Sequence, residues 1–184
     1  RGSRDGMQVD IASPDKDFLQ LLRPNVRCLR NAPRNEPPGL VLWDEQRLHR
    51  EVGLSPAQYI DMLALAGDAS DGYSGVKGIG PKFAQRLLQE FGSLEEVLER
   101  AGEVKRKSLR AALTAEEGRE AARLGKKLAT IRTDLQAPVL RQPWDNLRCG
   151  PPEDGGEALI SAFLALEFYT GVQRMQELWV RHEE

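Results

Sequence analysis

The most constraining feature of this 184-residue sequence is the glycine-rich segment Gly75-Val76-Lys77-Gly78-Ile79-Gly80-Pro81. Three glycines within six residues permit a tight reversal of the backbone, and proline is favoured at the first position of a helix. Upstream, Ser55–Gln58 has the pattern of a capping box with proline at the first helical position, which predicts a helix over 56–66. The sequence therefore predicts two helices joined by a tight glycine hairpin.

Further local signals outline the rest of the helical part. The segment after Pro81 is expected to be helical, because its apolar residues repeat at helical spacing: Ala84, Leu87, Leu88 and Phe91. Gly92 is expected to end this helix. Ser93-Leu94-Glu95-Glu96 is typical of a capping box and predicts the next helix. The strongly charged segment 105–131 is predicted to be helical, with these sparse apolar positions: Leu109, Leu113, Leu124 and Leu128.

The first 54 residues carry strand signals instead. Apolar residues at 9–11, 26–29 and 39–43 predict three strands, and residues 18–22 predict a helical run after the first. Asp44 is expected to cap a helix that ends near Val52. Residues 136–156 read as a Pro- and Gly-rich connection before one final amphipathic helix, which carries Leu159, Phe163, Leu166, Val172 and Trp179. The predicted fold class is α/β and mostly helical.

Charge is distributed unevenly along the chain. The formal net charge is -2, but residues 77–132 hold 13 basic and 8 acidic side chains, whereas residues 1–76 hold 9 and 11 and residues 133–184 hold 4 and 9. A basic middle between acidic flanks suggests a segment that faces nucleic acid. No run approaches the roughly 18 apolar residues of a membrane helix. Cys28 and Cys149 lack zinc-ligand spacing and are interpreted as reduced thiols of an intracellular protein.

Four aspartates form the first candidate site. Asp15 and Asp17 follow a predicted strand end, where ligands collect in α/β sheets, and Asp68 and Asp71 follow a helix. Converging carboxylates would require a hard cation, and oxygen ligands suit Mg²⁺ or Mn²⁺. From spacing alone the simpler interpretation is favoured, in which Asp17 caps a helix and the other pair are turn residues.

The glycine hairpin is the second candidate site. Its backbone N–H groups and the N-terminus of the following helix favour an anion, and Lys77, Lys82 and Arg86 add positive charge. We favour binding to a nucleic-acid backbone, directed by structure and sensitive to salt, over a plain tight turn. A further basic cluster is as compatible with a solvated helix face as with a DNA-tracking surface: Lys105, Arg106, Lys107, Arg110, Arg119, Arg123, Lys126 and Lys127.

Several ordered motifs resemble a known family. The segments 67–71, 75–82 and 87–95 are similar to the 5′-3′ exonuclease domain of bacterial DNA polymerase I and the related flap endonucleases. Ser13-Pro14-Asp15-Lys16-Asp17-Phe18-Leu19-Gln20-Leu21 resembles that family's SxDKDxxQL segment, and 127–134 and 166–168 match later landmarks in order. The resemblance spans about residues 7–178.

The resemblance implies a partial PIN-like α/β nuclease core over 1–54, a helix-hairpin-helix (H3TH) region over 55–135 that grips a duplex, and a linker and C-terminal helix over 136–184 that pack back on the core. Asp15, Asp17, Asp68 and Asp71 fall on the family's second-metal carboxylates, and a K⁺ ion is often found at the family's hairpin. The implied reaction is metal-assisted phosphodiester hydrolysis near a free 5′ end or a flap, on DNA in preference to RNA.

Two departures from the family pattern open an alternative. The family has a longer N-terminal half that supplies the first-metal carboxylates, which would here have to come from a separate piece or a larger assembly. In addition, residues 71–74 read Asp-Gly-Tyr-Ser where the family usually has Asp-Asn-Ile/Leu-Pro. A single-metal remnant would bind nucleic acid better than it cuts. The alternative is a retired nuclease that serves as a nucleic-acid-binding or scaffold subunit, and the expected compartment is bacterial cytoplasm or an organellar matrix.

Overall fold

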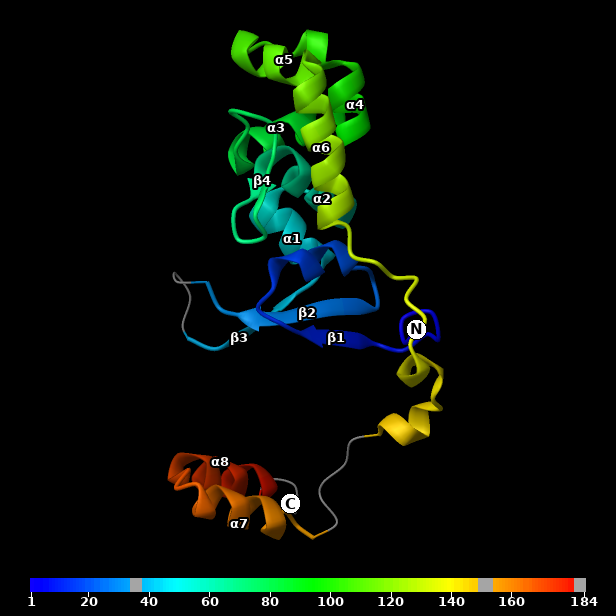
Figure 1. Cartoon of the computed structure of the whole chain (residues 1–184). Helices are drawn as coiled ribbons and strands as arrows, with labels where there is room; N and C mark the ends of the chain where they lie inside the picture. The colour runs from blue at the N-terminus through cyan, green and yellow to red at the C-terminus, as the bar shows by residue number, and fades with distance from the viewer. Residues whose placement is uncertain (34–37, 149–153, 181–184) are drawn as a thin grey trace. The chain divides into compact units, whose positions relative to one another are not determined.

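The chain divides into two units, residues 1–135 and residues 136–184, and each is considered by itself. The computed structural model describes residues 1–33, 38–148 and 154–180 (Figure 1). Cys149 therefore lies outside the described residues, whereas Cys28 is buried with a free thiol.

A small three-stranded sheet forms the N-terminal layer of the first unit. Its strands are β1 (Val9–Ala12), β2 (Val26–Asn31) and β3 (Leu40–Trp43), in the order β1-β2-β3. Strands β1 and β2 are parallel, with Val9 opposite Val26, whereas β2 and β3 are antiparallel. The predicted helical run is a 3-10 helix, η1 (Lys16–Leu21), and it connects the two parallel strands. All three predicted strands are confirmed.

Two well-capped helices follow the sheet. The Asp44 side chain accepts a hydrogen bond of 2.7 Å from the Arg47 N–H and caps α1 (Glu45–Val52). Helix α2 (Pro56–Ala66) begins with the predicted capping box, in which Ser55 and Gln58 exchange hydrogen bonds. Gly67 ends α2 with a positive φ of 74°. Local capping signals thus set both boundaries of α2 as predicted.

Further helices complete the first unit, and three of them pack against α2. They are α3 (Pro81–Phe91), α4 (Leu94–Glu99), η2 (Ala101–Glu103), α5 (Lys107–Thr114) and α6 (Glu116–Ala129). Helix α2 packs against α3, α4, α6 and η1, so that nearly all of its sides are buried. One hydrophobic cluster includes Leu19 of η1, Trp43 of β3 and Leu88 of α3. The sheet and the helices therefore share a continuous core.

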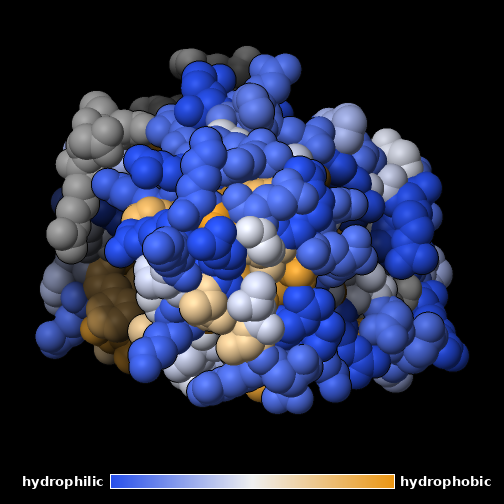
Figure 2. All heavy atoms as spheres, turned by 90° about the horizontal axis from the view of Figure 1, so that it is seen from above, coloured by the Kyte–Doolittle hydropathy of each residue, from blue (hydrophilic) through white to orange (hydrophobic). Residues whose placement is uncertain are grey.

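The charged segment 105–131 differs from the simple helical run that was expected. It breaks at Ala115, which has extended backbone angles and separates α5 from α6. Leu124 and Leu128 are 56% and 55% exposed, while the small residues of α6 face inward: Ala122, Gly125 and Ala129. A Cβ atom on Gly125 would lie 2.8 Å from the Ala64 carbonyl oxygen of α2. Small residues are inside because the two helices approach too closely for leucine. Seen from the α5 end, the surface is mostly hydrophilic with a small apolar area (Figure 2).

The second unit contains two helices where one was predicted. After the short 3-10 turns η3 (Pro138–Arg141) and η4 (Trp144–Leu147) come α7 (Glu157–Ala165) and α8 (Tyr169–Val180). Glu167, with a positive φ of 58°, interrupts the expected helix, and the Phe163 and Phe168 rings meet edge to face at 6.2 Å. The side chain of Trp179 lies outside the described part, and packing of this unit on the core stays a prediction. None of the helices in the described ranges is both long and apolar enough to cross a membrane.

Candidate metal centre and glycine hairpin

The acidic loop after β1 places Asp15 and Asp17 in different roles. Asp15 is the N-cap of η1, and its carboxylate accepts a hydrogen bond of 2.9 Å from the Asp17 N–H. The Asp15 N–H in turn donates to Ser13 Oγ at 3.2 Å. The simpler interpretation, in which Asp17 caps the helix, is therefore wrong, because Asp15 is the N-cap. Only the backbone N–H of Asp17 takes part in this cap, so its carboxylate is available to other side chains.

Asp68 and Asp71 are positioned by a tight two-stranded ribbon after α2. Strands β4 (Gly67–Asp68) and β5 (Tyr73–Ser74) pair antiparallel, and Gly72 at the turn has a positive φ of 73°. Gly75 closes the ribbon, since a Cβ atom there would lie 2.3 Å from the Gly67 nitrogen and 2.3 Å from the Leu65 carbonyl oxygen. The altered loop sequence thus forms a compact hairpin.

Three of the four predicted carboxylates converge. One oxygen from each of Asp17, Asp68 and Asp71 lies within 4.8 Å of the others. Asp68 is buried and Asp71 is exposed, so the cluster runs from the protein interior to its surface. Asp15 is not part of this group, although its charge acts on Asp17. The structure thus brings the two acidic loops together across fifty residues of sequence.

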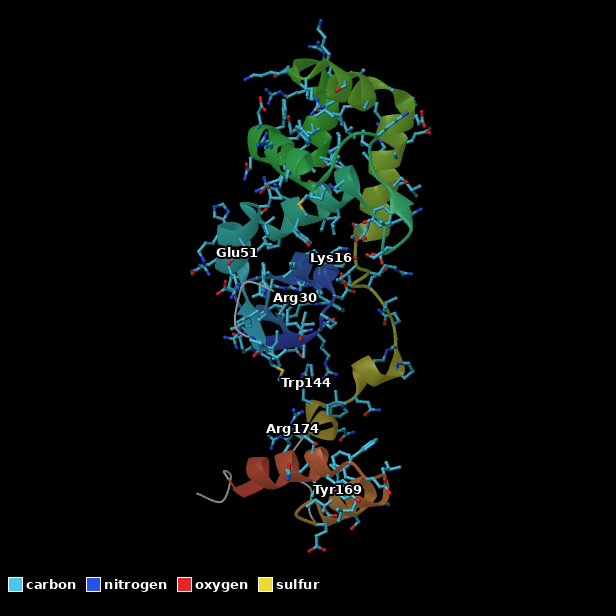
Figure 3. The ribbon with its side chains drawn as sticks, turned by 90° about the vertical axis from the view of Figure 1, so that its left-hand side faces the viewer. Lys16, Arg30, Glu51, Trp144, Tyr169 and Arg174 are labelled. Carbon is cyan, nitrogen blue, oxygen red and sulfur yellow. The ribbon has the colours of Figure 1, made fainter. Side chains whose placement is uncertain are left out.

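The cluster is partly neutralised from within. The Lys16 ammonium forms an ion pair with Asp68 Oδ2 and donates to Ser70 Oγ at 3.2 Å. Asp68 Oδ1 accepts hydrogen bonds from the Ser70 hydroxyl and, at 2.9 Å, from the Ser70 N–H. The Lys16 hydrogen bond, followed by that of Ser70, lowers the pKa of Asp68 to about 2. Lys16 lies where the sheet meets the helices of the first unit (Figure 3).

The pKa values of Asp17 and Tyr73 are raised, whereas that of Asp68 is lowered. Burial, followed by the negative charges of Asp15 and Asp71, raises the pKa of Asp17. Burial and the nearby aspartates also raise the pKa of Tyr73 to about 12. Asp17 Oδ1 and the Tyr73 hydroxyl are buried, with no hydrogen-bond partner among the described residues. A buried carboxylate oxygen without a donor is the kind of atom that a cation would satisfy.

Gln20 holds the acidic loop against the helical part, a role that the sequence analysis did not identify. Its Nε2 donates to the Ala129 carbonyl at 2.8 Å, and its Oε1 accepts from the Ile131 N–H at 2.9 Å. From the other side, Arg30 of β2 donates to the Pro14 carbonyl at 2.9 Å. The acidic cluster is thereby tied to the end of α6 and to the sheet.

The glycine hairpin is a tight turn with buried anchors and an exposed tip. The Ile79 N–H donates to the Val76 carbonyl at 2.9 Å, and Gly78 has a positive φ of 82°. Val76 and Ile79 are only 2% and 4% exposed, so their side chains anchor the turn in the core. Gly75 and Gly80 are partly exposed, while Lys77 and Gly78 lie at the surface.

The helix that follows presents further cations next to this tip. Gly80 is the N-cap of α3, and its carbonyl accepts bonds of 3.0 Å from the Phe83 and Ala84 N–H groups. Lys82 and Arg86 are exposed on α3. The predicted hairpin residues therefore divide into a buried anchor and an accessible basic edge.

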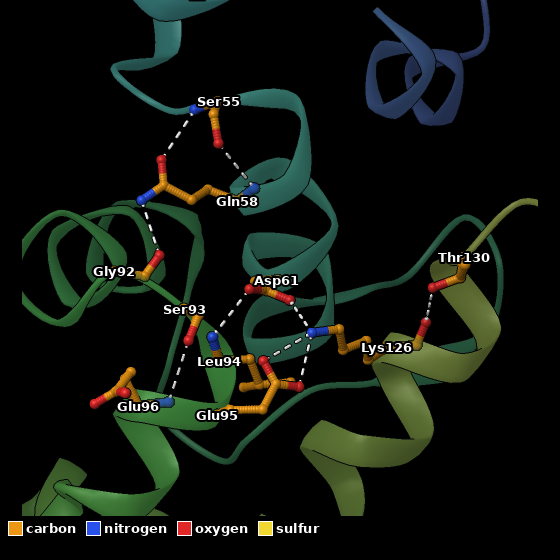
Figure 4. A network of polar contacts seen from close by, with 10 residues as sticks. All are labelled: Ser55, Gln58, Asp61, Gly92, Ser93, Leu94, Glu95, Glu96, Lys126 and Thr130. Atoms are coloured by element: carbon orange, nitrogen blue, oxygen red, sulfur yellow. Dashed lines mark hydrogen bonds and ion pairs between the residues drawn. The ribbon is translucent and has the colours of Figure 1, made fainter.

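A polar network centred on Asp61 fixes the helices around the hairpin (Figure 4). Buried Asp61 of α2 accepts from the Leu94 N–H of α4 at 2.9 Å and pairs with Lys126 Nζ of α6 at 2.8 Å. Lys126 also pairs with Glu95 at 2.7 Å. In the same view, Gln58 Nε2 donates to the Gly92 carbonyl at 2.9 Å. Asp61 is thus a structural group that joins α2, α4 and α6.

The predicted basic cluster divides among several local roles. Lys126 belongs to the Asp61 network, Arg119 donates to the Leu98 carbonyl at 2.6 Å, and Arg123 pairs with Glu116 at 3.4 Å. Arg106 lies over the Phe83 ring at 4.9 Å. These local contacts favour the interpretation of a solvated helix face for these four residues of the cluster.

Known structures share this fold. The T5 D15 protein co-crystallised with metal ions matches with a TM-score of 0.56 at 22% identity, over 66% of this chain and 42% of that one. The T5 5′-exonuclease with bound zinc matches with a TM-score of 0.56 at 23% identity, over 66% and 42% of the two chains. The fold class is accordingly a partial PIN-like core followed by a helical region, as predicted.

Sequence comparison identifies the family. Residues 54–154 match the family described as 5′-3′ exonuclease, C-terminal SAM fold, so the chain belongs to it. The thermostable DNA polymerase I of Thermus thermophilus is 42% identical over 139 residues, which are 76% of this chain and 16% of that protein. DNA polymerase I of Bacillus caldotenax is 34% identical over 176 residues, which are 96% of this chain and 19% of that protein. The chain thus spans less than a fifth of these polymerases.

Proposed function

We propose that this chain is the second-metal and duplex-binding part of a metal-dependent 5′-3′ exonuclease or flap endonuclease that acts on DNA. The observation that carries the proposal is the convergence of Asp17, Asp68 and Asp71 within 4.8 Å in a member of the 5′-3′ exonuclease family. The whole protein's activity and substrate are part of this proposal, because the chain spans a small share of its relatives.

The acidic cluster suits a divalent cation. Asp17, Asp68 and Asp71 would hold it, with Asp15 adding negative charge from the neighbouring N-cap position. The unpartnered buried oxygen of Asp17 and the all-oxygen donor set fit Mg²⁺ or Mn²⁺. Such an ion would supply an activated water and neutralise charge on a phosphodiester. The T5 structures with metal ions are consistent with a divalent ion in this fold.

The hairpin would hold the phosphate backbone of a duplex. Gly75, Gly78 and Gly80 keep this turn free of bulky side chains, while Lys77, Lys82 and Arg86 offer charge from its exposed edge. Val76 and Ile79 would position the turn without donating to the phosphate, since their side chains are buried and their N–H groups donate to the Leu65 and Val76 carbonyls. A K⁺ ion at the hairpin belongs to the same proposal. A T5 flap endonuclease of this fold is described in a complex with DNA and metal ions.

One observation favours the alternative of a retired nuclease that acts as a binding or scaffold subunit. Lys16 occupies Asp68, so part of the cluster is satisfied without a metal ion. Against this alternative, Asp17 and Asp71 form no ion pair within the described part of the chain, and a pure scaffold has no need of three converging carboxylates.

A cleavage and binding experiment separates the two functions. The 184-residue chain, and a longer protein in which it follows the N-terminal half of a family member, would be incubated with 5′-flap DNA and Mg²⁺ or Mn²⁺, with Asp68→Ala as control. Cleavage by the longer protein that is lost in the variant supports the nuclease. DNA binding without cleavage in either protein would support the scaffold.

The binding claim has its own measurement. Lys77→Ala and Lys82→Ala are each expected to weaken duplex affinity and to reduce the slope of log affinity against log salt by about 1. Fluorescence anisotropy over a salt series measures both quantities. Unchanged affinity and slope in both variants would show that the hairpin does not contact the duplex.

A further inference from the structure

Lys16 is a lysine held inside a site that is otherwise acidic. It lies between Asp15, the N-cap of η1, and Asp17, a member of the metal cluster. Its ammonium reaches across to Asp68 on the other acidic loop and to the Ser70 hydroxyl. The positive charge of Lys16 therefore neutralises part of the negative charge of the acidic cluster.

The Lys16 side chain is accessible to solvent. Its side chain is 37% exposed, whereas that of Asp68 is 5% exposed, so the ion pair joins a fixed buried carboxylate to a flexible arm at the surface. Asp68 Oδ1 is engaged by Ser70, which leaves Oδ2, the oxygen that Lys16 holds, as the position that a metal ion would take. Lysine and a divalent ion cannot both occupy that position.

We propose that Lys16 is a built-in counterion that a divalent ion displaces from Asp68, and that the released ammonium then binds a phosphate of the nucleic acid. The inference rests on the proposed function, since it takes the acidic cluster as a metal site. In the metal-free protein, Lys16 prevents repulsion between Asp68 and its neighbours and keeps the two acidic loops together. When the metal replaces it, the ammonium remains tethered at the mouth of the cluster, where a phosphodiester would approach.

Direct metal binding tests the displacement without any cleavage. Mn²⁺ is titrated into the wild-type chain and into Lys16→Met and Lys16→Gln, with isothermal calorimetry as the readout and far-UV circular dichroism to verify folding. Removing the competing charge should tighten Mn²⁺ binding at least about fivefold. Lys105→Met, which removes a positive charge from an exposed position outside the acidic cluster, is the matched control and should leave the affinity unchanged.

Salt dependence tests the transfer to phosphate. In Mn²⁺, Lys16→Met should lower the slope of log affinity against log salt for a non-cleavable phosphorothioate duplex by about 0.9, the contribution of one phosphate contact. In EDTA the slope should not change, because Lys16 is then engaged by Asp68. A metal-independent change, or no change in Mn²⁺, would overturn the transfer.

The outcomes distinguish this inference from the proposed function. Wild-type protein without saturable Mn²⁺ binding would overturn both. Wild-type protein that binds Mn²⁺, with folded Lys16 variants that bind it equally or more weakly, would overturn the counterion exchange and leave the metal site intact.

Discussion

Asp61→Ala should destabilise the fold through a single buried network. The change removes the acceptor of the Leu94 N–H, 2.9 Å away at the first turn of α4, and the partner of Lys126, 2.8 Å away on α6. A hydrogen bond to a charged group contributes about 1.5–3 kcal/mol. Lys126 keeps Glu95 and is 34% exposed, so its lost pairing adds about 0–1 kcal/mol. The expected loss in free energy of unfolding is about 1.5–4 kcal/mol.

Urea denaturation followed by circular dichroism at neutral pH measures this loss. Asp61→Asn keeps an acceptor for the Leu94 N–H but removes the charge, so it should cost about 1 kcal/mol. Glu95→Gln is the matched control, because it removes the exposed partner of the same lysine and should cost less than about 1 kcal/mol. If Asp61→Ala costs no more than Glu95→Gln, the network is not what holds α2, α4 and α6 together.

Three further outcomes follow from the described contacts. Gln20→Ala removes the hydrogen bonds of 2.8 and 2.9 Å to the end of α6, so thermal or urea unfolding should show a loss of about 1–3 kcal/mol, and a loss below about 0.5 kcal/mol would contradict this role. Gly75→Ala should cost about 1–3 kcal/mol or more, because its Cβ would lie 2.3 Å from backbone atoms, whereas Gly102→Ala, with open space around it, should be nearly neutral in the same assay. The pKa of Asp68 is lowered to about 2, so its ionised form stabilises the fold above its unfolded pKa of about 4, and that contribution is lost as the pH falls towards 2. Metal-free wild-type protein should therefore lose more stability than Asp68→Asn between pH 4 and pH 2 in acid titrations, and equal losses would rule out Asp68 as the source.

Signals carried by neighbouring residues predicted much of the fold. The capping box at Ser55–Gln58, the cap at Asp44 and the Gly–Pro start at Gly80–Pro81 each act within one helical turn, and the observed helices begin where these signals place them. Helix boundaries without such a cap were harder to predict. No side chain caps the helix that begins after Ala115. The charged sequence on both sides of Ala115 therefore predicts one continuous helical segment, although the structure has two helices.

Residue size and helix separation explain which face of α6 is buried. Leu124 and Leu128 are among the few large apolar residues of this segment, but both are exposed. The inward face consists of Ala122, Gly125 and Ala129, because the axis of α6 lies close to α2. Hydrophobic periodicity cannot show how near a neighbouring helix will come.

For the candidate site, the sequence determined which residue types were available, and the tertiary structure decided how they act. The acidic loops, the glycine-rich segment and the family resemblance pointed to the four aspartates and the hairpin as candidate sites, since each of these signals is carried by residues adjacent in the chain. Separating Asp15 as a cap from Asp17 as a cluster member, and pairing Lys16 with Asp68, required the packing of η1 against α2 and its ribbon. Coulombic and hydrogen-bond interactions act over a few ångströms, and the fold alone brings groups fifty residues apart within that distance.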